Sequence, residues 1–168
     1  MSSLLPRPVD LAATVSTMRT VAVVGLSPRG FQTSHRIAAY LQSAGLRVVP
    51  VNPNEGEILG ERAYPDLLSI PESVALDVVC VFRRPEFTAG VVQDAADRAE
   101  RTGQRPVVWT QLGVSTDDAR ALAAAAGLPY VANRCLMVDH SAMARGPVTA
   151  GDHTSVDDRS ADDRSADA

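Results

Sequence analysis

Short runs of consecutive apolar residues alternate along this chain with longer segments in which apolar residues recur every three or four positions. The runs are typical of buried strands, and the longer segments are typical of helices with one apolar face. Strands are predicted over residues 20–25, 47–51, 76–82, 106–110 and 129–132. An alternation of this kind indicates parallel strands that are joined by helices.

Helices are predicted over 34–44, 86–102 and 116–126, with a short helix near 9–18 and a helical turn over 66–70. Gly45 and Gly127 stand where the first and third of these helices end, and Ser115 or Thr116 opens the third. Five strands in this alternation predict an α/β fold. We expect a doubly wound parallel sheet with helices on both faces and the strand order 3-2-1-4-5.

The composition agrees with a single domain that has its own core. The chain has 168 residues, of which 45% are hydrophobic and 4% aromatic. No apolar run approaches the roughly 18 residues that span a membrane. The first residues lack the pattern of a signal peptide. We therefore expect a cytoplasmic protein without a membrane partner.

The charge is distributed unevenly. Residues 1–150 carry 14 Arg and 14 acidic residues, whereas 151–168 carry six Asp and two Arg and supply the whole net charge of −4. An electrically neutral body does not favour a nucleic-acid partner. The sequence DDRSA occurs twice near the end, with hardly any large apolar residue around it. We expect a domain over 1–145 and a disordered acidic tail over 146–168.

The residue types of the chain exclude or disfavour some kinds of chemistry. The chain has no Lys, which excludes a catalytic lysine. Cys80 lies in an apolar run and is predicted to be a core residue, and a disulfide with Cys135 is not expected. Cys135, Asp139 and His140 form a small cluster for which a structural role is favoured over metal or thiol chemistry.

The ends of the predicted strands carry the candidate binding residues, because ligands of doubly wound sheets bind beyond the carboxyl ends of the strands. Gly25 ends the first strand and allows a sharp turn, and Ser27 and Arg29 follow with a hydroxyl and a guanidinium. Thr33 or Ser34 is expected to cap the next helix, whose N-terminus favours an anion. This corner is predicted to bind phosphate.

The other corners are also polar or turn-forming. Asn52 and Pro53 follow the second strand, and Arg83 and Arg84 follow the third. These two arginines are either ordinary surface residues or a further phosphate clamp, in which one faces the cleft and the other faces solvent. The fourth corner consists of Gln111, Leu112 and Gly113.

Two other readings of the first corner are less favoured. The glycine pattern is Gly-x-Ser-x-x-Gly, and Asn52 stands where a dinucleotide site usually has an acid. Both departures count against NAD. A serine nucleophile would need Gly-x-Ser-x-Gly, but residue 29 is Arg.

Six segments, taken together and in this order, carry a family resemblance: VAVVGLSPRG, VVPVNP, ILGERAYPDL, VVCVFRRPE, VVWTQLGV and NRCLMVDH. They resemble the small stand-alone CoA-binding proteins of bacteria, the YccU-like family, and the CoA-binding domain of the succinyl-CoA synthetase α subunit. The resemblance covers about residues 18–143. It implies a Rossmann-like fold that binds coenzyme A or an acyl-CoA in an extended pose over the strand ends.

The resemblance also implies roles for individual residues. Phosphates would be held by Gly25, Ser27 and Arg29, beside the helix start at Ser34. The nucleotide would be bordered by Pro50, Asn52 and Pro53. The pantetheine or the 3′-phosphate would lie along Phe82, Arg83, Arg84 and Pro85, and the cleft would be lined by Gln111, Leu112 and Gly113. Asn133 and Asp139 stand where the family often has Asp and Glu, which weakens any role for that segment.

The resemblance favours a binding module without catalysis of its own. The related ligases need a phosphorylated-histidine domain and an ATP-grasp partner, and a chain of this length would contain neither. One alternative is an enzyme: an NAD(P)-dependent oxidoreductase, or an acyl-CoA-handling activity with an unknown acyl-transfer partner. Another is a nucleotide or redox sensor that forms a homodimer.

Overall fold

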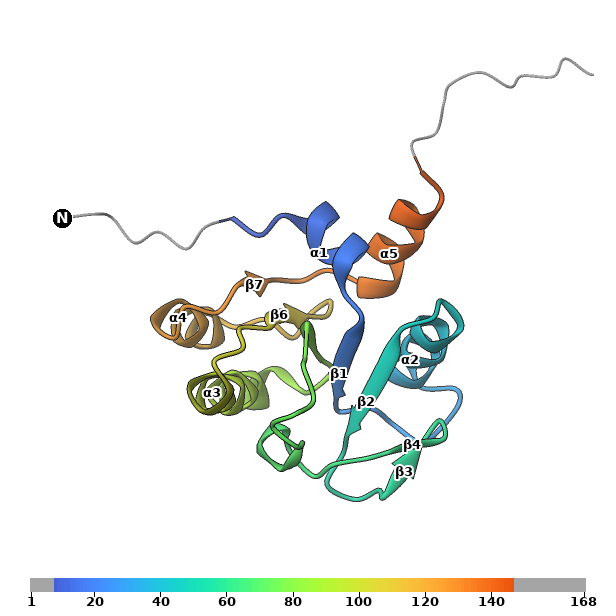
Figure 1. Ribbon diagram of the computed structural model, residues 1–168, viewed down its shortest axis with the longest axis horizontal. Coiled ribbons are helices and arrows are strands. Elements are labelled where there is room, and N and C mark those ends of the chain that lie inside the picture. The colour runs from blue at the N-terminus through green and yellow to red at the C-terminus, as the bar shows by residue number, and fades with distance from the viewer. Residues whose placement is uncertain (1–7, 147–168) are drawn as a thin grey trace, which may run out of the picture.

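Five parallel strands form the central sheet of the computed structural model, which describes residues 8–146 (Figure 1). They are β1 (Thr20–Val24), β2 (Arg47–Val51), β5 (Val78–Val81), β6 (Val107–Thr110) and β7 (Tyr130–Val131), in the spatial order β2-β1-β5-β6-β7. The helices are α1 (Leu11–Thr17), α2 (Thr33–Ser43), α3 (Pro85–Thr102), α4 (Asp117–Ala125) and α5 (Leu136–Ala144). The doubly wound Rossmann-like α/β fold is confirmed.

The expected 3-2-1-4-5 pattern holds, but the outer position beside β2, which the third predicted strand was expected to fill, is taken by the segment at Tyr64. Tyr64 forms a single parallel bridge with Val51 of β2. Its N–H donates to the carbonyl of Pro50 at 3.0 Å, and its carbonyl accepts from the N–H of Asn52 at 2.9 Å. The predicted strand over 76–82 is β5, which pairs with β1, so its assignment to the outer position is wrong. The outer segment escaped prediction because only one residue of it pairs.

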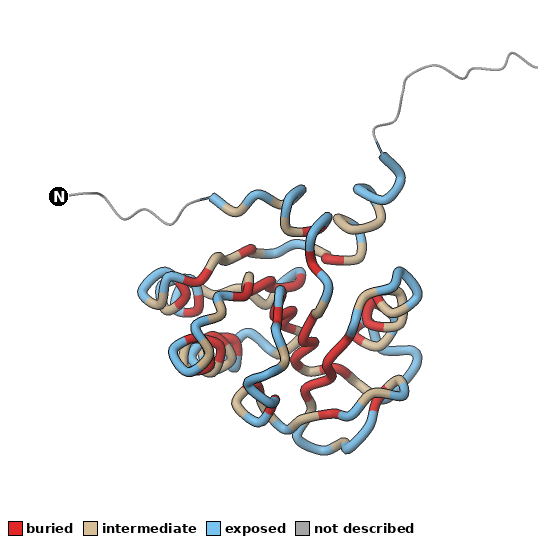
Figure 2. The backbone as a smooth tube through the Cα atoms, in the orientation of Figure 1, coloured by how far each residue is buried: buried red, intermediate tan, exposed pale blue. Residues whose placement is uncertain are grey.

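The two faces of the sheet bury different helices. Val21 and Val23 of β1 belong to a core cluster that includes α2 and the start of α5. Ala22 and Val24 belong to the opposite cluster, with α3 and α4. Burial on both faces explains why the strands are continuous apolar runs rather than alternating ones. Figure 2 shows the buried positions along the strands and on the helix sides that face them.

The helix that precedes β1 and the helices between the strands lie within about two residues of their predicted bounds. Asp10 caps α1 and Thr116 caps α4, each accepting a hydrogen bond from a backbone N–H of the first turn. The predicted turn over 66–70 is a 3-10 helix, η1 (Leu67–Ser69), capped by Asp66.

Two elements were not predicted. A small antiparallel hairpin of β3 (Glu57–Ile58) and β4 (Glu61–Arg62) lies between β2 and the 3-10 helix, where the sequence pattern predicts no helix or strand. It turns at Leu59 and Gly60, which both have positive φ, at 54° and 75°. The second is α5. The predicted disordered tail lies, apart from Gly146, outside the described residues. Within 8–146, no helix combines the length and apolarity needed to cross a membrane.

Candidate functional site

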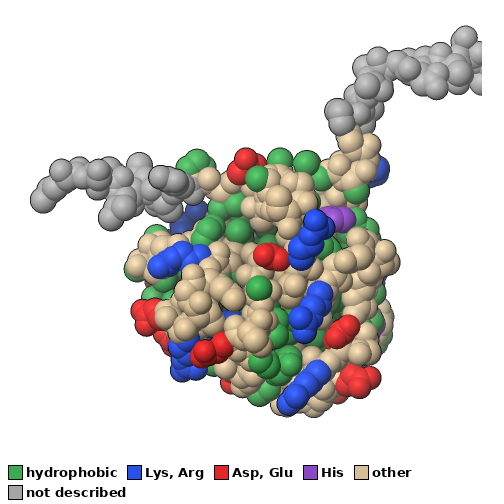
Figure 3. Space-filling view, viewed as in Figure 1, with side chains coloured by type: hydrophobic (Ala, Val, Ile, Leu, Met, Phe, Trp, Pro, Cys, Tyr) green, Lys and Arg blue, Asp and Glu red, His purple; other side chains and the backbone are tan. Residues whose placement is uncertain are grey.

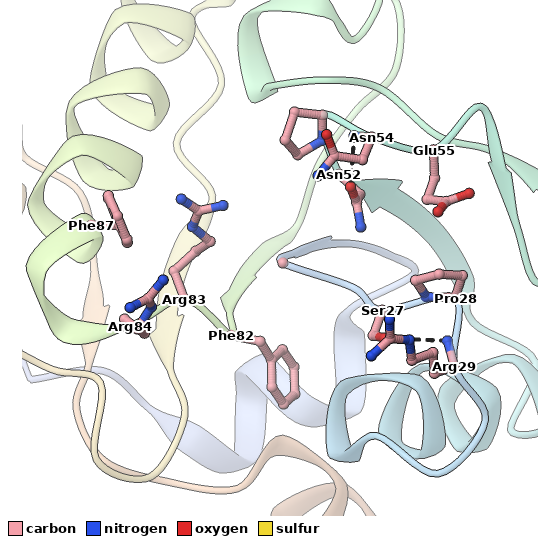
Figure 4. Close-up of a pocket in the computed structure, with 12 residues that line it drawn as sticks. Ser27, Pro28, Arg29, Asn52, Asn54, Glu55, Phe82, Arg83, Arg84 and Phe87 are labelled. Atoms are coloured by element: carbon pink, nitrogen blue, oxygen red, sulfur yellow. Dashed lines mark hydrogen bonds between the residues drawn. The ribbon is translucent and has the colours of Figure 1, made fainter.

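A cleft of about 620 Å³ opens at the carboxyl ends of β1, β2 and β5. It lies at the switch point of the sheet, because the chain leaves β1 toward α2 on one face and leaves β5 toward α3 on the other. Figure 4 shows the three segments that surround it. Its lining consists of Gly25, Ser27, Pro28, Arg29, Asn52, Pro53, Asn54, Glu55, Phe82, Arg83, Arg84 and Phe87.

Gly25 ends β1 in a conformation that other residues rarely adopt. Its φ is +84°, and a Cβ at this position would lie 2.7 Å from the carbonyl oxygen of Phe82. The N–H of Gly25 donates to the carbonyl of Val51 at 2.9 Å. A glycine here therefore lets the chain turn against β5 and leaves bare backbone at the floor of the cleft.

The loop after Gly25 is held by side chains from its surroundings. The Ser27 N–H donates to Ser34 Oγ at 3.0 Å, and His35 Nδ1 donates to the Ser27 carbonyl at 2.9 Å. The expected capping role of Thr33 or Ser34 is wrong. Gln32 occupies the N-cap position of α2 without a side-chain cap, while Ser34 is buried within the first turn and faces the loop.

The second corner is tied to the first. Asn52 Nδ2 donates to the carbonyl of Leu26 at 2.9 Å, and Asn52 Oδ1 accepts from the N–H of Asn54 at 2.8 Å. Asn52 therefore fixes the distance between the ends of β1 and β2. Pro50 does not line the cleft, because it is buried inside β2.

The third corner supplies two arginines on an aromatic support. The guanidinium of Arg83 lies 4.5 Å from the centroid of the Phe87 ring, and that of Arg84 lies 5.7 Å from it. Arg83 is half-buried, whereas Arg84 is exposed and lies 3.7 Å from the Glu86 carboxylate. Both arginines line the cleft. Pro85 is the first residue of α3 and does not line it.

The charge of the lining is positive. Three guanidinium groups, those of Arg29, Arg83 and Arg84, face a single carboxylate, Glu55. Arg29 comes from the β1–α2 loop, on the other side of the cleft from the two arginines that follow β5 (Figure 4). On the face shown in Figure 3, basic and acidic side chains are interspersed. The cleft is thus suited to an anion that both sides can contact.

A second cavity of about 370 Å³ adjoins the cleft on the α3 side. The two share Gly25, Pro53, Arg83 and Phe87, and the second reaches Asp66 and Asp94. Burial raises the pKa of Asp94 above its ordinary value, and the nearby Asp66 and Asp97 raise it further.

The fourth corner is closed. Gln111 is 6% exposed, and its Oε1 accepts from the N–H of Leu136 at 3.1 Å. The N–H of Gly113 donates to Asn133 Oδ1 at 2.7 Å. These contacts bind the end of β6 to the segment that enters α5. Neither Gln111 nor Leu112 nor Gly113 lines the cleft.

The structure therefore brings eight predicted residues together and adds four. Those added to the prediction are Pro28, Asn54, Glu55 and Phe87. Pro28 and Asn54 are direct neighbours in sequence of predicted residues, and Glu55 follows Asn54. Phe87 stands three positions after Arg84, on the first turn of α3. Extending each corner by one helical turn would have found them all.

The cluster near the C-terminal end of the described residues has structural contacts. Asp139 pairs with Arg134 through two hydrogen bonds of 2.7 Å, and His140 Nδ1 hydrogen-bonds the Tyr40 hydroxyl at 2.8 Å. Cys135 precedes α5 at its N-cap position. Within 8–146, no three His, Cys, Asp or Glu side chains are grouped so that they could hold a metal ion. Cys80 is fully buried in the core, as predicted, and this burial raises the pKa of its thiol.

A parallel sheet with a cationic cleft where its helices diverge defines a doubly wound α/β domain whose main cleft lies at the carboxyl edge of the sheet, the edge at which such domains bind ligands. The chain belongs to the family described as CoA binding domain, whose model matches residues 19–141. The resemblance carried by the six sequence segments is confirmed at this level.

Individual proteins are similar to this chain over different shares of its length. The uncharacterized protein YneT of Bacillus subtilis (strain 168) is 32% identical over 136 residues, which are 81% of this chain and 96% of that protein. A hypothetical protein from Pyrococcus horikoshii OT3 has a solved structure with a TM-score of 0.73 and 33% identity, covering 82% of this chain and 96% of the other. Acetate–CoA ligase (ADP-forming) I of Archaeoglobus fulgidus is 40% identical over 63 residues, 38% of this chain but only 9% of the ligase.

Proposed function

We propose that this protein binds coenzyme A or an acyl-CoA in the cleft at the carboxyl ends of β1, β2 and β5. The observation that carries the proposal is the pair of opposed cationic walls, Arg29 on one side and Arg83 with Arg84 on the other. Membership of the CoA-binding domain family supports the same ligand.

The chemistry of coenzyme A suits this arrangement. The molecule carries a diphosphate and a separate 3′-phosphate on the ribose, so that it presents negative charge at two places. One wall of the cleft can hold each group through charge-assisted hydrogen bonds. The N-terminus of α2 adds backbone N–H groups and a favourable dipole beside Arg29.

The predicted residues take the following roles in this proposal. Gly25 and Arg29 contact the diphosphate. Ser27 donates the hydrogen of its hydroxyl, because its N–H is already bonded to Ser34 Oγ and its Oγ accepts from the Arg29 N–H at 3.2 Å. Asn52 and Pro53 border the nucleotide. Arg83 and Arg84 bind the 3′-phosphate or the first atoms of the pantetheine, beside Phe82.

The relatives also bound the proposal. The name of the Archaeoglobus fulgidus protein describes a ligation of acetate to CoA, and this chain matches less than a tenth of that protein. We therefore propose binding of the CoA moiety only. Our expectation that the chain acts without catalysis of its own stays a prediction.

The direct test compares ligands by calorimetry and thermal unfolding. A ligand that binds only the native state stabilises it by about 2.7 kcal/mol when its concentration is 100 times Kd. CoA is expected to raise Tm and to titrate with heat at one site, dephospho-CoA to bind more weakly, and NAD⁺ and ATP to produce much smaller shifts. No shift at millimolar CoA overturns the proposal. A larger shift with NAD⁺ than with CoA favours the dinucleotide alternative.

Arg29→Ala tests the cleft itself. Loss of a charge-assisted phosphate contact is expected to weaken CoA binding by about 1.5–3 kcal/mol, roughly 10- to 150-fold. Arg47→Ala is the matched control, because Arg47 is an exposed arginine at the opposite, amino end of β2. Unchanged affinity in Arg29→Ala removes this residue from the site.

A further inference from the structure

Three side chains from outside the β1–α2 loop hold two consecutive residues of that loop. Asn52 Nδ2 donates to the Leu26 carbonyl at 2.9 Å, and Ser34 Oγ accepts from the Ser27 N–H at 3.0 Å. His35 Nδ1 completes the set by donating to the Ser27 carbonyl at 2.9 Å. The residues that follow in the loop, Pro28 to Gly30, are exposed and include the cleft arginine Arg29.

We propose that His35 and Ser34, with Asn52 across the cleft, are positioning residues that preform the phosphate-binding loop before the ligand arrives. The inference rests on the proposed function and deepens it. None of the comparisons assigns this role, and His35 does not line the cleft itself.

The direction of these hydrogen bonds supports the proposal. In an ordinary N-cap, a side chain before the helix accepts from the N–H groups of the first turn. Here side chains of the first turn of α2 reach back to the loop instead, and Gln32 makes no side-chain cap. Within residues 8–146, no side chain accepts from the N–H groups of Thr33, Ser34 or His35. The backbone of Leu26 and Ser27 is thus bonded to side chains of Asn52 and α2, while the N-terminus of α2 keeps its N–H donors for an anion.

The protonation of His35 follows from its partner. A carbonyl oxygen only accepts, so Nδ1 carries the hydrogen in this contact. An asparagine at this position can place an amide nitrogen where Nδ1 lies, whereas alanine cannot. His35→Asn is therefore the conservative variant, and His35→Ala is the disruptive one.

Preorganisation predicts a loss of affinity without direct contact. When one of these side-chain hydrogen bonds is absent, the ligand-free loop samples more conformations. Ligand binding must then order the loop, which costs conformational entropy. We expect His35→Ala to weaken CoA binding about tenfold and His35→Asn to restore most of that affinity. In the ligand-free protein, the backbone amides of Arg29 and Gly30 are expected to exchange hydrogen faster in His35→Ala than in the unaltered chain.

His140→Ala is the matched control. His140 also uses Nδ1 in a tertiary hydrogen bond, to the Tyr40 hydroxyl, but it links α2 to α5 and does not line the cleft. This variant is expected to lower Tm while leaving the affinity for CoA within twofold. Ser34→Ala is the second test variant and carries the test if His35→Ala does not fold.

The outcomes separate the two proposals. Absence of CoA binding to the unaltered chain overturns both of them. If the unaltered chain binds CoA, then equal affinity in His35→Ala and Ser34→Ala overturns the positioning role alone. Equal losses in His35→Ala and His35→Asn, with unchanged amide exchange, also overturn it, because the imidazole would then act by its volume and not by its hydrogen bond.

Discussion

The corner after β1 and the corner after β6 look alike in sequence and differ in the structure. Each combines polar residues with a glycine of positive φ, Gly25 at 84° and Gly113 at 79°. The first corner leaves Arg29 at an open cleft. The second uses Gln111 and Gly113 to bind the segment that enters α5. Polar residues at a strand end thus line a cleft at the first corner, whereas at the second they hydrogen-bond to another part of the fold.

The direction of the following helices explains the difference. The helix after β1 packs on one face of the sheet and the helix after β5 packs on the other, so the chain diverges between these two strands and leaves a gap. The helices after β5 and β6 both pack on the same face, and the chain after β7 crosses the end of β6. In this sheet, polar residues at a strand end are therefore candidates for a ligand site only next to the gap between β1 and β5, where the chain leaves toward opposite faces.

The largest expected effect comes from breaking the closed corner. Gln111→Ala removes the acceptor of the Leu136 N–H, and Leu136 is fully buried. An unsatisfied buried donor costs about 1–3 kcal/mol, so the free energy of unfolding in urea is expected to fall by this amount. The affinity of the folded protein for CoA is expected to remain within twofold.

Leu112→Ala is the control for this corner, because Leu112 is the next residue and its side chain is 64% exposed. It is expected to change stability by less than about 0.5 kcal/mol. A tenfold loss of CoA affinity in Gln111→Ala, with stability preserved, would instead place the corner after β6 in the binding site.

Most of the central sheet and its helices could be predicted from the sequence. Apolar runs and helical periodicity were sufficient for β1, β2, β5, β6 and their helices, because each strand is buried on both faces. The single bridge at Tyr64 and the hairpin of β3 and β4 were missed, since a one- or two-residue pairing leaves no periodic pattern.

For the site, the residue types were predictable and their exposure was not. Gly25, Arg29 and Arg83 follow from the rule that strand ends bind ligands. The role of Ser34 did not follow, because a serine near a helix start usually caps it, and only the folded loop shows that its hydroxyl accepts from Ser27. The closure of the corner after β6 depends equally on a tertiary contact, between Gln111 and Leu136.

Arg83 and Arg84, which follow β5, line the same open cleft as Arg29 and differ in burial. Arg83 is half-buried and lies closer to the Phe87 ring, whereas the Arg84 side chain is 78% exposed and lies near Glu86. A contact that is shielded from water is the stronger one. Arg83→Ala is expected to weaken CoA binding about tenfold, or about 1.4 kcal/mol, and Arg84→Ala by less than threefold, as measured by calorimetry.

Raising the salt concentration sharpens this comparison. Screening by salt acts mainly on exposed charges. The contribution of Arg84 to CoA affinity is therefore expected to fall before that of Arg83 as the salt concentration rises from about 0.05 to about 0.5 M, a range in which the Debye length shortens severalfold. Equal losses for the two variants at every salt concentration would contradict the difference in burial as the cause.

The smallest expected effect concerns Asp94, an acid in the second cavity beside the open cleft. Asp94 lines the second cavity, and its pKa is raised by burial and then by Asp66 and Asp97. At the closed corner, by contrast, Asp139 has a bidentate partner in Arg134. A raised carboxyl pKa means that ionised Asp94 is less favourable in the folded chain than in the unfolded one. This penalty is absent below the ordinary Asp pKa of about 3.9, grows as the pH rises through the raised pKa, and is complete above it.

Asp94→Asn is therefore expected to stabilise the protein at pH 7, by less than about 1 kcal/mol, and to lose this advantage as the pH falls toward 4. Urea unfolding at both pH values measures the effect, with Glu100→Gln, an exposed carboxyl of the same helix, as the control. Destabilisation of Asp94→Asn at pH 7 would mean that the carboxylate of Asp94 is favourably paired, as the carboxylate of Asp139 is with Arg134 near the closed corner.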